Sequence, residues 1–164
     1  MVPIRRPVAE KFSVYYARNG LLPRRLLAPD LHAKIELLCK EGEDFASQKL
    51  FSEARAKYIE ALKLLPDKIS DWEASTWIYV AIGDTHFYTG NFEKVMKCFF
   101  NAVQCPAGLG NPYVHLRLGQ AYFELENLDK AADELTRAYM GGGMEVFMED
   151  DPKYLSFLET RIEI

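Results

Sequence analysis

The stretch PYVHLRLGQAYFELENLDKAADELTRA, which spans residues 112–138, decides the fold class. Its apolar residues recur every three or four positions on both sides of Glu126-Asn127, as in two amphipathic helices joined by a short turn. Asn111 and Pro112 supply a cap and a first-turn proline at its start. No strand with two-residue alternation is found elsewhere in the 164 residues. The sequence therefore predicts an all-α protein.

This helix pair has two earlier copies in the chain. Each copy has a glycine in its first helix, with a large residue before it and an aromatic residue or histidine three positions after it. The second helix then carries small and large residues that alternate along one face. The residues of this pattern are Leu38, Gly42, Phe45, Ala54, Tyr58 and Ala61 in the first copy, Tyr79, Ile82, Gly83, His86, Phe99 and Ala102 in the second, and His115, Leu118, Gly119, Tyr122, Ala131, Leu135 and Ala138 in the third.

The three glycines have a physical reason to recur. Gly42, Gly83 and Gly119 lack a side chain, so a partner helix can approach them closely. The large residues of the second helix fill the space beside each contact. A pair of this kind buries one face by itself and the rest only by stacking on its neighbours, which predicts an elongated array.

The register resembles that of the tetratricopeptide repeat, and GNFEK (90–94) and ENLDK (126–130) resemble its turn. The resemblance implies an α-solenoid of three helix-turn-helix repeats closed by a C-terminal capping helix. The glycines are 41 and 36 residues apart, whereas about 34 is usual, so the first gap must hold an extended connection or longer helices around residues 67–73. The predicted domain is 30–164, with repeats at about 31–67, 71–107 and 111–141 and the cap at about 151–162.

The chain begins with a basic leader. Residues 1–29 contain six basic side chains and one acidic one, so they carry +5. Because the whole chain carries −4, the remaining residues carry −9. Three interpretations stay open: a loosely docked arm, an extra helix from about Pro7 to Asn19 packed on the first repeat, or an Arg-rich mitochondrial presequence.

Composition and motifs exclude several classes of function. No apolar run is long enough to span a membrane, and a pI near 5.5 argues against binding nucleic acid. Three cysteines with no C-x-x-C pair favour a reducing, cytoplasmic compartment. No nucleophile motif, phosphate loop or metal-ligand spacing is present, so we expect no enzyme, no cofactor and no metal.

The resemblance also indicates a working surface. In tetratricopeptide arrays the first helix of each pair lines a concave groove. The residues beside its packing face here include aromatic residues and carboxylates, which suit a basic protein or peptide. The alternative is that some of these aromatic residues pack between repeats or under the leader. The predicted partner-binding residues are Glu36, Glu43, Trp77, Asp84, Phe87, Tyr88, Tyr113, Gln120, Phe123 and Glu124.

Three functions follow as expectations. The first is a non-enzymatic protein-binding module with a basic partner. The second is a bacterial immunity protein that inhibits a cognate toxin, such as a nuclease, because residues 138–155 resemble the end of small stand-alone tetratricopeptide immunity proteins. The third is an organelle-associated assembly or import adaptor, in which the basic leader would matter most. The lysine and asparagine clamp of chaperone-tail binders is absent from the groove positions.

Overall fold

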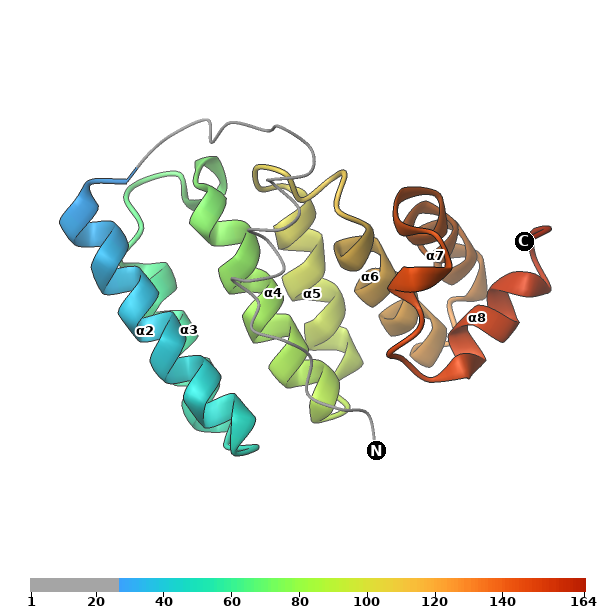
Figure 1. Cartoon of the computed structure of the whole chain (residues 1–164), viewed down its shortest axis with the longest axis horizontal. Helices are drawn as coiled ribbons and strands as arrows, with labels where there is room; N and C mark the ends of the chain where they lie inside the picture. Colours follow the sequence, from blue (N-terminus) through green and yellow to red (C-terminus); the bar gives the residue numbers. More distant parts are fainter. Residues whose placement is uncertain (1–26) are drawn as a thin grey trace.

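A computed structural model describes residues 27–164, and this part of the chain is helical with no β-strand. The predicted all-α class is thus confirmed there, while the proposed helix at 7–19 lies outside the described residues. The helices follow one another in chain order along the long axis of the molecule (Figure 1). They are α2 (Pro29–Ser47), α3 (Phe51–Lys63), α4 (Glu73–Tyr88), α5 (Phe92–Val103), α6 (Pro112–Glu124), α7 (Leu128–Gly142) and α8 (Pro152–Glu159), with short 3₁₀ turns η1 (Ile69–Asp71) and η2 (Met144–Val146).

The same close contact joins the two helices of each pair. A Cβ atom added to Gly42 would lie less than 3 Å from the ring of Tyr58. The equivalent atom on Gly83 would meet Phe99, and on Gly119 it would meet Leu135. In each pair the large residue follows its glycine by sixteen positions. The predicted reason for the glycines, close approach of the second helix, therefore holds in all three pairs.

The turn inside each pair is also repeated. The residue seven positions after each glycine has a left-handed backbone: φ is 63° at Lys49, 70° at Gly90 and 59° at Glu126. The next residue donates its N–H to a carbonyl five residues earlier, which closes the end of the first helix. These bonds are Leu50 N–Phe45 O at 2.9 Å, Asn91 N–His86 O at 3.0 Å and Asn127 N–Tyr122 O at 2.9 Å.

The connection between α3 and α4 accounts for the wider first spacing of the glycines. It contains η1, which is preceded by Lys68 in a left-handed conformation. The indole of Trp72 donates to the carbonyl of Pro66 at 3.3 Å, and the hydroxyl of Ser75 donates to the carbonyl of Ile69. The extra residues thus form an ordered turn in place of longer helices.

The C-terminal segment closes one end of the array. Asp151 caps α8 by accepting from the N–H of Lys153 at 3.0 Å, and Pro152 occupies the first turn, so α8 begins where the sequence predicts the capping helix to begin. Tyr154 and Leu158 of α8 are buried with Phe147 in the hydrophobic cluster that holds residues of α6 and α7. At the same end, α7 continues through Gly142 before the chain turns at Gly143.

Candidate partner-binding surface

The ten predicted partner-binding residues lie on α2, α4 and α6, and we call them the first-helix surface. Their exposure differs widely. Glu36 is exposed, whereas Asp84 is 8 % exposed and Gln120 is wholly buried. Asp84 and Gln120 therefore do not present side chains to an open groove, contrary to the expectation from sequence. The others are half-buried: Glu43, Trp77, Phe87, Tyr88, Tyr113, Phe123 and Glu124.

Asp84 is buried because α6 satisfies its carboxylate. The hydroxyl of Tyr113 lies 2.8 Å from each carboxylate oxygen of Asp84. The Nε of Arg117 donates to Asp84 Oδ1 at 3.0 Å and lies 3.0 Å from the Tyr113 hydroxyl. Two predicted binding residues on neighbouring first helices are thus in direct contact, and an arginine that sequence reasoning did not select donates to both.

Arg117 is the centre of a buried polar cluster. Its side chain has no exposed area, and its guanidinium carbon lies 4.0 Å from the centre of the Phe87 ring. Its Nη1 donates to Gln120 Oε1 at 2.8 Å and to Asp150 Oδ1 at 3.1 Å. We call Arg117 and its partners Asp84, Phe87, Tyr113, Gln120 and Asp150 the Arg117 cluster.

The electrostatics of the Arg117 cluster favour the charged guanidinium. Burial opposes the charge, but Tyr113, Asp84 and Asp150 outweigh it and hold the pKa of Arg117 well above its ordinary value. Two donors of the cluster, Arg117 Nη2 and Gln120 Nε2, are buried without a hydrogen-bond partner among the described residues. The cluster therefore ties α4, α6 and the segment before α8 together as a structural unit.

Helix α8 covers the last part of the first-helix surface. The Phe123 ring meets the rings of Tyr154 and Phe157 edge-on, with centroid distances of 5.5 and 5.1 Å. Glu124 accepts from the Tyr154 hydroxyl at 2.7 Å and pairs with Lys153 Nζ at 2.6 Å. Burial and this carboxylate raise the pKa of Tyr154. Phe123 and Glu124 thus make their contacts within the protein, with side chains of α8.

The α2 and α4 part of the first-helix surface is more open. Glu36 is exposed and lies 3.2 Å from His32, one turn earlier on α2. Between Glu36 and Glu43 lies the buried thiol of Cys39, whose pKa is raised to about 12 by burial and by the two carboxylates. The Tyr88 ring stacks on Phe51 with centroids 5.6 Å apart. This part of the surface thus holds the exposed carboxylate of Glu36, the half-buried carboxylate of Glu43 and the half-buried ring of Tyr88.

Trp77 lies at the junction of two cores. Its half-buried side chain packs against both the cluster that joins α2, α3 and α4 and the cluster that joins α4, α5 and α6. Its main contribution in the structure is therefore packing between pairs, which is the alternative weighed for the aromatic residues.

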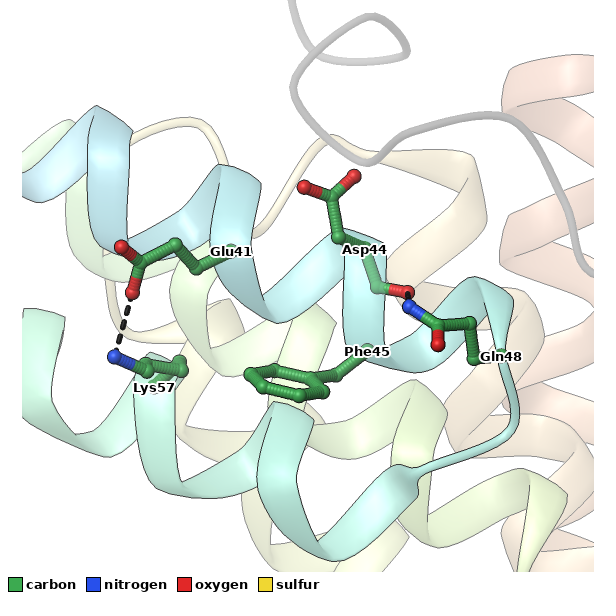
Figure 2. A pocket seen from close by; sticks show the side chains of 5 residues that line it. All are labelled: Glu41, Asp44, Phe45, Gln48 and Lys57. Atoms are coloured by element: carbon green, nitrogen blue, oxygen red, sulfur yellow. Dashed lines mark hydrogen bonds and ion pairs between the residues drawn. The ribbon is translucent and has the colours of Figure 1, made fainter.

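A pocket of about 390 Å³ lies outside the first-helix surface, on the side of α2 that no described helix covers. Its lining residues come from α2 and α3: Glu41, Asp44, Phe45, Gln48 and Lys57. Figure 2 shows the Phe45 ring between the Glu41–Lys57 pair, which is 2.5 Å apart, and the Gln48 side chain. We call this the α2 edge pocket; the sequence did not predict it.

Within 27–164, no group of three or more His, Cys, Asp and Glu side chains is placed to hold a metal ion. None of the helices in this range has the length and apolar character that crossing a membrane requires.

Sequence reasoning missed Arg117 and Asp150, although a signal for Arg117 existed. Arg117 follows Tyr113 by four positions and precedes Gln120 by three, so all three share one face of a helix. Its partner Asp150 lies in an acidic run, Glu149-Asp150-Asp151, directly before the predicted capping helix. The chain matches no known family model, and no curated protein is significantly similar to it.

Proposed function

We propose that this protein is a tetratricopeptide-type α-solenoid that binds a basic protein or peptide on the α2 and α4 part of its first-helix surface. Three features support a repeat array: the repeated glycine contact, the repeated left-handed turn, and the stacking of each pair on the next. In such an array the first helix of each pair would form the concave, partner-facing side.

The observation that carries the choice of partner is charge. Residues 30–164 carry −9, because the leader holds +5 of a total of −4. On the open part of the surface, Glu36 is exposed, and Glu43 and the aromatic Tyr88 are half-buried. Carboxylates next to aromatic rings suit arginine and lysine side chains, and the overall charge speeds the encounter with a basic chain.

The burial of Asp84 limits which of the predicted residues can be substituted in a binding test. Asp84→Lys would place a second cation beside the buried Arg117 and damage the fold, so a loss of binding would say nothing about the groove. Glu36 and Glu43 avoid this problem because neither contacts Arg117 in the structure. They are the residues of choice for a binding test.

The test uses the partner recovered from native lysate and measures its affinity by calorimetry. Glu36→Lys with Glu43→Lys should weaken binding at least about tenfold, because each reversal replaces attraction by repulsion. Glu53→Lys with Glu60→Lys changes the net charge equally on exposed positions of α3 and should change affinity less than about twofold. Equal effects of the two pairs would contradict the proposed surface.

A second candidate, an immunity protein, is favoured by one observation. The stretch 138–155, whose sequence resembles the end of such proteins, supplies Asp150 to the Arg117 cluster and Tyr154 to Glu124. Its toxin would be basic, given the −9 charge. Co-expression with a toxin encoded beside it should restore growth, and the purified pair should form a complex at micromolar concentration; no complex would exclude this role.

A further inference from the structure

The first helix of each pair has an edge that faces the preceding pair, and α2 lacks a described neighbour there. The residue five positions before each glycine lies on this edge, and its burial differs among the three pairs. Ile78 of α4 has no exposed area and lies in the core cluster that contains α3 residues, and Val114 of α6 is buried in the same way with α5 residues. The equivalent Leu37 of α2 is 59 % exposed.

At the two internal junctions, the side chains that meet across this edge are chemically matched. The position two residues after the glycine is Thr85 in α4, and Arg55 Nη1 of α3 lies 3.4 Å from its hydroxyl and 3.5 Å from its carbonyl oxygen. One repeat later the same two positions are Ala121 of α6 and Met96 of α5, which lie in one apolar cluster. A polar residue thus meets an arginine, and an apolar residue meets a methionine.

On α2 the corresponding residue is Asp44, which is exposed. It lines the α2 edge pocket beside the Phe45 ring (Figure 2). Its carboxylate makes no ion pair with the described residues, whereas Glu41 is paired with Lys57. The pocket is therefore lined by two carboxylates, of Glu41 and Asp44, but by one ammonium group, of Lys57. The aromatic ring of Phe45 also lines it. By the matching seen at the internal junctions, the side chain that belongs opposite Asp44 is a cation.

We propose that the α2 edge is a second docking surface, which takes a helix of another protein carrying an arginine. The guanidinium would lie against Phe45 and pair with Asp44, and an apolar neighbour would cover Leu37. Arginine fits better than lysine because its planar fork both stacks on a ring and binds a carboxylate in two places. This surface is separate from Glu36 and Glu43 and goes beyond the proposed function.

Two other occupants must be distinguished from this one. A second copy could not stack head to tail by its α7 end, because α8 covers α7; a symmetric pair of α2 edges is still a possible outcome. The basic residues 1–26 of the chain itself are the other possible occupant, since the leader carries +5.

The first experiment titrates the full, isotope-labelled chain with acetyl-arginine amide and follows its NMR spectrum. The matched control compound is acetyl-citrulline amide, which has nearly the same shape without the charge. Signals of Asp44, Phe45 and Gln48 should shift with millimolar affinity, at least about fivefold tighter for arginine. Asp44→Asn should abolish that preference, while Asp133→Asn, on an exposed α7 residue, should keep it. No shift at the pocket, or equal shifts with both compounds, would overturn the proposal.

The second experiment identifies the occupant with the same full chain. Sedimentation equilibrium should show a monomer, and the arginine compound should leave the signals of residues 1–26 in place. A dimer that Asp44→Lys dissociates would assign the edge to a second copy, and displacement of signals from residues 1–26 would assign it to the leader; either result overturns the proposed partner. The variant with Glu36→Lys and Glu43→Lys should titrate like the wild type, so failure here is distinguishable from failure of the proposed function.

Discussion

The two ends of the helical array are built differently. At the α8 end, Phe147, Tyr154 and Leu158 continue the hydrophobic core, and Asp150 reaches the buried Arg117. At the α2 end, the edge that would meet a further helix keeps Leu37 exposed and opens into a pocket. Both ends belong to helix pairs of the same register.

The difference shows that the repeat pattern specifies how pairs stack but not how the stack ends. An end needs residues from outside the pattern, and at the α8 end these are a polar cluster and a short amphipathic helix. Contacts that close an end should therefore dominate stability, whereas residues on the open edge should be nearly neutral. The following predictions test this contrast, in order of decreasing effect.

The largest effect is expected at the centre of the closed end. Arg117→Met leaves Asp84 and Asp150 as buried carboxylates without their main partner, which should cost about 3–5 kcal/mol of unfolding free energy. Urea denaturation followed by circular dichroism measures this loss. Arg137→Met is the control, because Arg137 is exposed in a pair with Asp133 and should cost less than about 0.5 kcal/mol. Similar losses in both variants would contradict the role of the cluster.

The second prediction compares one leucine from each end. Leu158→Ala removes a fully buried side chain of α8 and should destabilise the protein by about 2–4 kcal/mol. Leu37→Ala acts on a side chain that is 59 % exposed and should change stability by less than about 0.5 kcal/mol. The midpoint of urea unfolding gives both values; a large loss for Leu37→Ala would mean that the α2 edge is covered in solution.

The third prediction concerns pH at the closed end. His115 is buried, with Nδ1 2.6 Å from Glu134 and Nε2 2.6 Å from the carbonyl of Leu109. Burial disfavours the imidazolium, but these acceptors outweigh it and raise the pKa of His115. The resulting stabilisation is complete below about pH 6.5 and is lost as pH rises through the folded pKa. Stability should therefore fall between pH 6 and 8, and His115→Gln should flatten this dependence.

His86, in the middle of the array, should behave in the opposite way. Burial and then the positive charge of Arg55 lower the pKa of His86 to about 4. Its contribution is present above about pH 6.5 and is lost as pH falls towards 4. NMR titration of the two imidazoles separates the effects, and a single shared pKa near 6.5 would refute both assignments.

The smallest effect is expected at the repeated turns. Gly90 holds its left-handed conformation at no steric cost, whereas Glu126 holds the same conformation with a side chain. Glu126→Gly should stabilise the protein by up to about 1 kcal/mol, and Gly90→Ala should destabilise it by about 1 kcal/mol. The unfolding temperatures of the two variants should shift in opposite directions from that of the wild type. Shifts in the same direction would show that the turns are not equivalent.

Much of the helical framework could be predicted because its signals are local. Asn111-Pro112 and Asp151-Pro152 begin helices, and the three glycines mark the close contacts inside each pair. The candidate surface was harder to predict. Sequence reasoning placed Asp84 and Gln120 in an open groove because it assigned each residue to a helix face without knowing what lies opposite. Arg117 and Asp150 are 33 positions apart, and no local pattern indicates that they meet.

The sequence alone determined the helical class, the three glycine contacts and the acidic charge of the body, because these depend on periodicity and composition. The tertiary structure decided which polar residues are accessible. Burial and hydrogen bonding depend on side chains that come from distant helices, as Arg117 does for Asp84 and α8 does for Phe123 and Glu124. It also decided where the array is open, because an edge is exposed only if no other segment packs on it, and for α2 no described segment does.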